Sequence, residues 1–189
     1  MTYEENISRK TFLRMGLRSV ARAIGSVVEK GAERLNRRKS VRPPGAVEEP
    51  AFMALCDLCG KCWEACESGA IRQAVGGGML EGTPVIDPGE APCWLCESVA
   101  CSKACPRGAL NPVERDEVKI GVAKINESTC FFHQGMDKSC DYCYDRCPLK
   151  DKAIVFDGGP VVNEDLCSGC GVCEYYCVSN PKSIVVSPL

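Results

Sequence analysis

Sixteen cysteines in a chain of 189 residues are the side chains that could do chemistry. They form four groups of four, and the first cysteine of each group recurs at an interval of 37 residues, which indicates copies of one structural unit. We call these groups runs one to four: Cys56, Cys59, Cys62 and Cys66; Cys93, Cys96, Cys101 and Cys105; Cys130, Cys140, Cys143 and Cys147; and Cys167, Cys170, Cys173 and Cys177. Cysteines at this density bind metal or form disulfides, so the runs contain the candidate functional residues.

The spacing within each run favours four-iron four-sulfur clusters. Runs one and four read C-x2-C-x2-C-x3-C, the bacterial ferredoxin pattern in which three thiolates hold one cluster and the fourth reaches a second. Run two has a longer second interval, run three has an insertion after Cys130, and both end in Cys-Pro. Zinc sites combine two separated pairs around one ion, and disulfides need an oxidising compartment, so both fit less well. We expect all sixteen cysteines to be metal ligands of four 4Fe-4S clusters.

Two pairings of the runs are open. Runs one and four share the regular spacing, whereas runs two and three are irregular and end in Cys-Pro, and this sorting slightly favours a nested order in which one and four enclose two and three. The nested cluster sites are Cys56, Cys59 and Cys62 with Cys177; Cys167, Cys170 and Cys173 with Cys66; Cys93, Cys96 and Cys101 with Cys147; and Cys130, Cys140 and Cys143 with Cys105. The alternative is sequential pairing, one with two and three with four, which the similar gaps between runs allow.

The segments between the runs predict short strands. Apolar segments follow each run at residues 70–71, 109–110, 153–156 and 183–186, and others precede runs two, three and four at residues 84–87, 120–126 and 161–163. Asp157-Gly158-Gly159-Pro160 has the composition of a hairpin turn. We therefore predict an α+β fold of two bacterial-ferredoxin-like two-cluster modules, nested, with an additional amphipathic helix at the N-terminus.

Charge divides the chain into a basic arm and an acidic body. Residues 1–42 carry eleven Lys and Arg against four Glu, whereas residues 43–189 carry twelve against twenty-one Asp and Glu. We predict an N-terminal helix and linker over residues 1–42, with Pro43-Pro44-Gly45 marking the junction, and a four-cluster body over residues 43–189. The acidic body argues against nucleic acid as a partner. No stretch approaches the roughly 18 uncharged apolar residues of a membrane span.

The arm is predicted to form a basic amphipathic helix over residues 11–35. Its apolar residues fall on one half of a helical wheel, and Arg14, Arg18 and Arg22 line the other half. Such a helix can lie on an anionic membrane, dock on a partner or pack on the body, and all three readings stay open. Residues 8–14 resemble a twin-arginine export signal, but Lys10 replaces the second arginine and charges interrupt the following apolar stretch. We expect a cytoplasmic protein, peripheral at the inner membrane, with a periplasmic location as the alternative.

Other chemistry is not expected. The chain has no G-x-G-x-x-G fingerprint for a flavin or nicotinamide, and no nucleophile set can be assembled once the cysteines bind iron, so we do not expect an enzyme. His133, the only histidine, could replace Cys130 as a ligand but is expected to be a loop residue with local hydrogen bonds. Trp63 and Trp94 each follow a ligand cysteine and are expected to keep water from the clusters.

The order of these features resembles the MauM/NapG type of ferredoxin-like proteins. The resemblance is carried by Arg42-Pro43-Pro44-Gly45-Ala46, Cys130-Phe131-Phe132-His133-Gln134-Gly135, residues 143–154 and residues 167–174. It implies an electron carrier with 4Fe-4S clusters that serves a redox partner such as a periplasmic nitrate reductase or a methylamine dehydrogenase system. Run two also resembles a run in the four-cluster subunits of molybdenum oxidoreductases. Residues 62–67 are similar to the cytoplasmic NapF-type ferredoxin, which makes a maturation or interaction factor for a metalloenzyme the alternative function.

Overall fold

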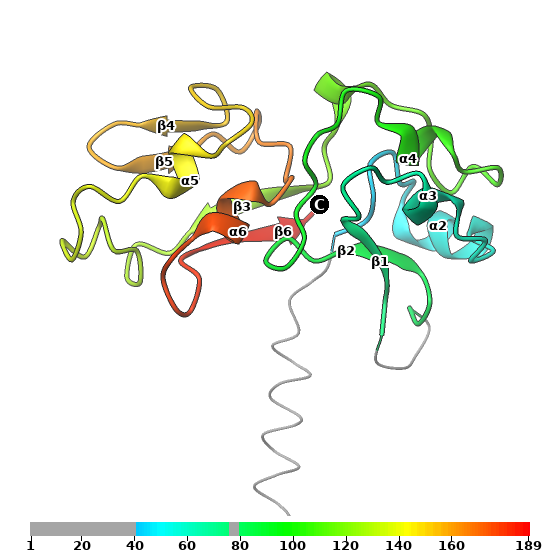
Figure 1. Ribbon diagram of the computed structural model, residues 1–189, viewed down its shortest axis with the longest axis horizontal. Helices are drawn as coiled ribbons and strands as arrows, with labels where there is room; N and C mark the ends of the chain where they lie inside the picture. Colours follow the sequence, from blue (N-terminus) through cyan, green and yellow to red (C-terminus); the bar gives the residue numbers. More distant parts are fainter. Residues whose placement is uncertain (1–40, 76–79) are drawn as a thin grey trace, which may run out of the picture. The chain divides into compact units, whose positions relative to one another are not determined.

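The computed structural model describes residues 41–75 and 80–189, which form an α+β body of short helices and two-stranded sheets (Figure 1). The elements are α2 (Glu49–Leu55), α3 (Lys61–Glu64), β1 (Ile71–Gln73), β2 (Pro84–Ile86), α4 (Ala100–Lys103), η1 (Arg115–Glu117), β3 (Gly121–Ile125), α5 (Tyr142–Asp145), β4 (Ile154–Phe156), β5 (Pro160–Val162), α6 (Val172–Tyr176) and β6 (Ile184–Pro188). The helix predicted over residues 11–35 lies outside the described residues. Within the described ranges, no helix is both long and apolar enough to span a membrane.

The first half of the body, residues 41–110, forms module one. Strands β1 and β2 make an antiparallel hairpin between runs one and two, with Ile71 opposite Ile86. The segment before run one closes the module against the segment after run two, because Ala46 bridges Leu110 and the Val47 amide donates a 3.1 Å hydrogen bond to the Ala109 carbonyl. Module one therefore contains runs one and two together with its own closing contact.

The second half, residues 120–189, repeats this plan as module two. Strands β4 and β5 form a hairpin between runs three and four, with the Asp157 amide hydrogen-bonded to the Gly159 carbonyl at 2.9 Å, which confirms the predicted turn. Strand β3, before run three, pairs along its whole length with β6, after run four, from Gly121 opposite Pro188 to Ile125 opposite Ile184. Figure 1 shows the elements of each module gathered on their own side of the body.

The nested order predicted from the sequence is wrong, because the modules follow one another along the chain. The strand predicted over residues 120–126 forms as β3, and its partner is β6 at the C-terminus. Sequential modules also need shorter chain closures than nested ones, and the entropic cost of closing a loop rises with its length. The spacing that runs one and four share therefore indicates that their local loops are similar. It does not indicate that the two runs belong to one module.

Few large apolar side chains hold the body together. Phe52, Ile86, Leu110, Ile154 and Ile184 are the largest apolar side chains with almost no exposed surface among the described residues. Seven of the sixteen cysteines are buried, and they are part of the same core. Each module therefore encloses its thiols with a thin apolar layer, as expected for a chain with 6% aromatic residues.

Residues 41–46, where the sequence predicted the linker, are packed into the body. Val41 is fully buried and bridges Ile86, and Pro43 and Pro44 are also fully buried. These side chains extend the β1–β2 hairpin and cover its end, so the chain enters the packed body before the prolines.

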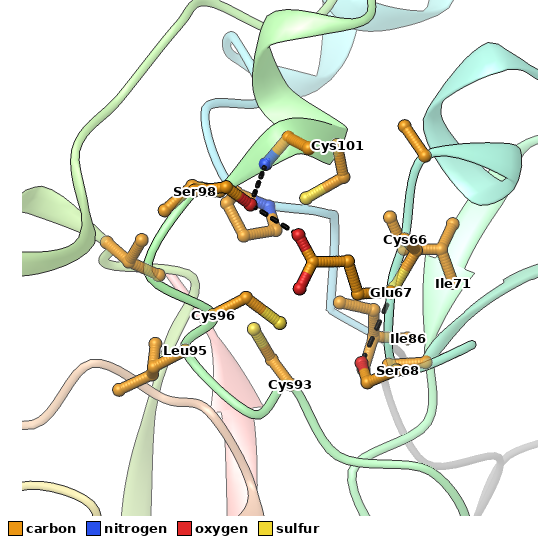
Figure 2. Close-up of a pocket in the computed structure, with 16 residues that line it drawn as sticks. Cys66, Glu67, Ser68, Ile71, Ile86, Cys93, Leu95, Cys96, Ser98 and Cys101 are labelled. Carbon is orange, nitrogen blue, oxygen red and sulfur yellow. Dashed lines mark hydrogen bonds between the residues drawn. The ribbon is translucent and has the colours of Figure 1, made fainter.

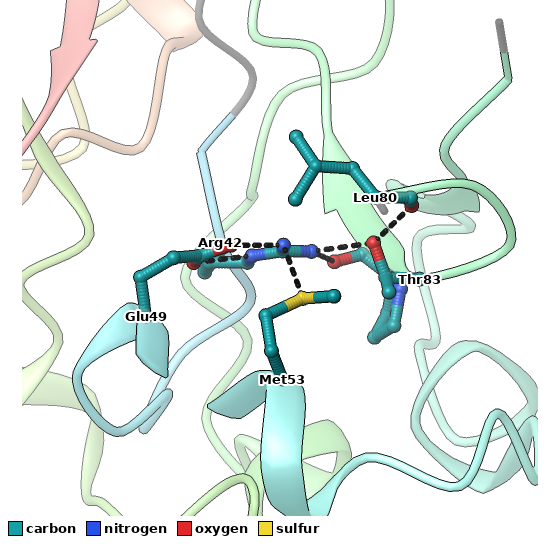
Figure 3. A network of polar contacts seen from close by, with 6 residues as sticks. Arg42, Glu49, Met53, Leu80 and Thr83 are labelled. Carbon is teal, nitrogen blue, oxygen red and sulfur yellow. Dashed lines mark hydrogen bonds and ion pairs between the residues drawn. The ribbon is translucent and has the colours of Figure 1, made fainter. Parts of the chain in front are cut away.

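Arg42 ties this entry segment to α2 and to β2 (Figure 3). Its guanidinium donates hydrogen bonds to both carboxylate oxygens of Glu49, to the Thr83 hydroxyl at 2.8 Å and to the Pro84 carbonyl at 2.9 Å, and it lies 4.4 Å from the centre of the Phe52 ring. The hydrogen bond from Arg42 holds the pKa of Glu49 below its ordinary value. The pair is therefore intact above the ordinary pKa of a glutamate, and its contribution is lost as pH falls through the lowered pKa.

We predict that Arg42→Ala lowers the free energy of unfolding by about 1.5–3 kcal/mol, because it leaves partly buried acceptors without their charged donor. Anaerobic urea unfolding of the cluster-loaded protein measures this change. Arg72→Ala is the matched control, since the Arg72–Glu90 pair is 3.5 Å long with both side chains more than half exposed, and such pairs contribute about 0–1 kcal/mol. Equal losses in the two variants would contradict a structural role for Arg42.

Candidate iron-sulfur cluster sites

The sixteen cysteines gather into four sets, each combining three cysteines of one run with the last cysteine of the other run in the same module. The thiols of sets A, B and C line three separate pockets, and those of set D are electrostatic neighbours. The sets are A (Cys56, Cys59, Cys62 and Cys105), B (Cys93, Cys96, Cys101 and Cys66), C (Cys130, Cys140, Cys143 and Cys177) and D (Cys167, Cys170, Cys173 and Cys147). This is the sequential pairing, and the four nested sets predicted from the sequence do not occur.

Local structure explains how one run presents three thiols to one space. The third cysteine of every run lies in a short helix, α3, α4, α5 or α6. The residue before the second cysteine has positive φ in runs one, two and four, at Leu58 (59°), Leu95 (50°) and Gly169 (73°). Positive φ at the third position of a four-residue turn reverses the chain, so the first two cysteines face the same space as the helical one.

Set B illustrates the arrangement (Figure 2). Its thiols line a space of about 400 Å³, and Figure 2 shows the Cys93 and Cys96 side chains pointing toward one another. Cys101 comes from α4, whereas Cys66 comes from the end of run one. Two segments separated by the β1–β2 hairpin therefore have to meet before the set is complete.

Sets A and C lie at more exposed positions than set D. The pockets of sets A and C measure about 330 and 390 Å³ when the solvent at their openings is included. All sixteen cysteines lie in the part of the chain that the structure describes, and Cys59 of set A is the one that is exposed, whereas three of the four set D cysteines are buried. A redox group in set A would therefore be the closest of the four to solvent.

The four sets follow one another in the order A, B, D, C. Run one supplies both A and B, and run two does the same, so these sets are neighbours within module one. In module two, Cys143 of set C acts electrostatically on Cys173 of set D. Between the modules, the Cys93 amide of set B donates a 2.8 Å hydrogen bond to the Cys170 carbonyl of set D. The body thus contains a single file of four thiol sets.

Burial raises the pKa of most of these thiols, so they stay protonated at neutral pH unless a cation is bound. It raises the pKa of Cys93 and Cys143 to about 12 and that of Cys62, Cys101 and Cys147 to about 11. Neighbouring thiols add to the effect, first Cys170 of set D at Cys93 and first Cys130 of the same set at Cys143. A bound metal centre removes this penalty, because a coordinating thiol is deprotonated.

In three of the four cysteines that end a run, the surroundings stabilise the negatively charged thiolate. Burial alone would raise the pKa of Cys66, Cys105 and Cys177, but hydrogen bonds outweigh it and lower all three. The donors are the backbone amides of residues that come after each cysteine in the chain. The Ser68 hydroxyl is a further donor at Cys66, and the Ser179 hydroxyl is a further donor at Cys177. The two serines occupy the same position after runs one and four, a shared feature that the sequence analysis overlooked.

The donor sets fit a four-iron four-sulfur cluster better than a single ion. Thiolates that share one zinc each lie about 2.3 Å from it. In the described part of the chain, no group of three or more His, Cys, Asp or Glu side chains could hold one metal ion. The thiols instead line pockets that, together with the solvent at their openings, measure about 330 to 400 Å³. Four soft thiolate donors around a larger space are the donor set of a 4Fe-4S cluster.

A carboxylate also enters set B. Glu67 follows Cys66 where runs two and three have proline, and its carboxylate extends into the space between the thiols (Figure 2). The Ser98 hydroxyl donates a 2.7 Å hydrogen bond to Glu67, and the carboxylate contributes to raising the pKa of Cys96, after burial. Set B therefore carries a negative charge beyond its thiols.

The remaining residues singled out in the sequence lie around the sets. The Nδ1 atom of His133 is buried and makes no hydrogen bond within the described residues, so the local hydrogen bond expected there is not formed; its ring packs edge-on against Phe132 at 5.8 Å. Trp94 packs edge-on against Tyr176 at 6.4 Å, although it is still 44% exposed. Trp94 thus covers the junction between the modules only partly.

Curated proteins similar to this chain are ferredoxin-type proteins. The chain is 35% identical over 200 residues to the ferredoxin-type protein NapG of Escherichia coli strain K12, covering 96% of this chain and 86% of that protein. It is 36% identical over 203 residues to the methylamine utilization ferredoxin-type protein MauM of Paracoccus denitrificans strain Pd 1222, covering 95% and 89%. The ferredoxin-type protein NapF of E. coli is 29% identical over 143 residues, covering 72% and 79%. No family model matches the chain.

We predict that Cys177→Ser damages set C and leaves set A intact. Loss of a metal group frees the other thiols of its set, so alkylation followed by peptide mapping should label Cys130, Cys140 and Cys143. Cys66→Ser is the matched control and should expose the thiols of set B in the other module. Labelling of Cys56, Cys59 and Cys62 in Cys177→Ser would restore the nested pairing.

We also predict that Glu67→Gln raises the reduction potential of the group in set B, because removing a negative charge favours the added electron. The expected shift is on the order of tens of millivolts, where about 59 mV is a tenfold change for one electron. Redox titration followed by electron paramagnetic resonance measures it. Glu81→Gln removes the same charge from an exposed residue that lines none of the three pockets, and a shift as large in that variant would count against a local effect.

Proposed function

The chain belongs to the family of ferredoxin-type proteins that includes NapG and MauM, and we propose that it relays single electrons through four 4Fe-4S clusters between a donor protein and a partner oxidoreductase. The observation that carries this proposal is the single file of thiol sets A, B, D and C. When bound, a 4Fe-4S cluster supplies one-electron exchange. A file of four such sites has two ends, as a relay between two partners requires.

The residues of the chain hold the sets in line and limit the access of water. The last cysteine of each run joins neighbouring sets within a module, and the buried cysteines of set D keep the middle of the file away from solvent. Exposure of Cys59 supports set A as one end at which electrons are exchanged with a partner. Hydrogen bonds to thiolates and local charge then tune the potential of each site.

The partner is proposed to be another redox protein. The name of MauM refers to methylamine utilization, and both MauM and NapG are described as ferredoxin-type proteins. This chain shares about a third of its residues with them over nearly its whole length. By that relationship we propose an electron-transfer subunit that donates to or accepts from an enzyme and does not itself catalyse a reaction.

We predict sixteen iron atoms and sixteen sulfides per chain after anaerobic purification, from four clusters of four each. Stepwise reduction should take up about four electrons per chain, because each cluster accepts one. Iron and sulfide assays with a coulometric titration measure both values. Cys59→Ser is a useful companion variant, since it alters only set A and should leave the twelve iron atoms of the other sets.

Iron near eight per chain, or stoichiometric zinc, would contradict the relay. Purification with native partners distinguishes the relay function from the alternative, a function as a maturation factor. A stable stoichiometric complex with a redox enzyme that reduces or oxidises the bound clusters supports the relay. Binding only to an apoenzyme, without electron exchange, would show that the maturation function is the correct one.

A further inference from the structure

The two modules meet through the backbones of two ligand cysteines. The Cys93 amide in set B donates its 2.8 Å hydrogen bond to the Cys170 carbonyl in set D, so a ligand of one set is joined directly to a ligand of the other. The same two thiols are electrostatic neighbours. From the Cys93 sulfur to the Cys170 sulfur, the connection consists of side-chain and backbone bonds and this one hydrogen bond.

Gly171 allows the modules to approach this closely. It follows Cys170, its φ is +87°, and a methyl group placed on it would lie 2.3 Å from Cβ and 2.9 Å from Cα of Pro88 in the segment that leads into run two. Carbon atoms cannot approach to such distances, so any side chain at position 171 would push the segment before Cys93 away. The absence of a side chain at this position is therefore required for the contact between the modules.

Resting on the proposed function, we propose that the Cys93–Cys170 hydrogen bond is the path by which electrons cross between the modules, and that Gly171 keeps this path short. In the crossing, one electron leaves set B and arrives at set D, or the reverse. One site is oxidised by one electron and the other is reduced by one, while no covalent bond changes and no proton moves. The ultimate reductant and oxidant are the one-electron redox proteins at the two ends of the relay.

The test compares the cluster-loaded wild-type chain with Gly171→Ala and with Gly158→Ala. Gly158 has a similar positive φ of 63° and lies in the same module, but a methyl group there meets nothing within 4 Å. This control therefore adds the backbone strain without the steric clash. The first readout is protection of the Cys93 amide against hydrogen exchange. The second is the rate at which an electron injected by pulse reduction equilibrates between the modules, followed by freeze-quench electron paramagnetic resonance.

We expect Gly171→Ala to lose the protection of the Cys93 amide and to slow equilibration between the modules, with iron content unchanged, while Gly158→Ala matches the wild type. Wild-type electron transfer in Gly171→Ala after the protection is lost would overturn the proposed path. Retained protection in that variant would overturn the role of Gly171.

A second variant keeps the test valid if Gly171→Ala does not assemble. Pro88→Gly combined with Gly171→Ala removes Cβ of residue 88, the atom 2.3 Å from the added methyl, and leaves Cα at 2.9 Å, so it should restore part of the protection and part of the rate. Restored protection with slow transfer would overturn the path. Fewer than sixteen iron atoms in the wild-type chain would instead contradict the proposed function, so the two failures are distinguishable.

Discussion

The constraint on which this structure depends is that no run can complete a thiol set alone. Cys66 belongs to set B and Cys105 to set A, so runs one and two have to fold against each other before either set has four donors. The same exchange links runs three and four. Because ligand binding supplies folding free energy, metal bound at the proposed sites would fasten each module in two places. This accounts for a body that holds together with few large apolar side chains.

Around these sets the chain uses polar contacts where its apolar core is thin. Arg42 connects the entry segment with α2 and β2 through one guanidinium. In module two the Val186 amide of β6 donates a 2.7 Å hydrogen bond to the buried Glu174 of α6, the helix that carries Cys173. Both contacts fix the end of a module to elements beside a thiol run, so they hold the ligands in position as well as the fold.

Sequence reasoning predicted what depends on local spacing. The α+β class, six of the seven strands predicted around the runs and the turn at residues 157–160 follow from patterns within a few residues, and the structure confirms them. The strand predicted at residues 109–110 is not formed, and Leu110 makes only an isolated bridge with Ala46. The pairing of runs was not predictable from spacing, because it depends on the partner of β3, and β6 lies about sixty residues further along the chain. Arg42 was assigned to a linker for a similar reason, since Thr83 and Pro84 are distant in sequence. The Cys93–Cys170 hydrogen bond joins two backbones and has no sequence signal.

The two serines that follow runs one and four divide the file into unlike sites. Ser68 and Ser179 place a hydroxyl at the thiolates of Cys66 and Cys177, in sets B and C, whereas the corresponding ligands of sets A and D precede a proline. Hydrogen bonds to a ligand sulfur stabilise the reduced state. Set D receives other donors, the Ser168 hydroxyl at Cys170 and the Ala123 amide 3.5 Å from the Cys167 sulfur, so the sets differ in which donors reach their ligands. Glu67 weakens the effect at set B, and Val178 replaces that charge at set C. Sets B and C thus share a serine donor and differ in local charge, a difference that would separate the potentials of clusters bound there.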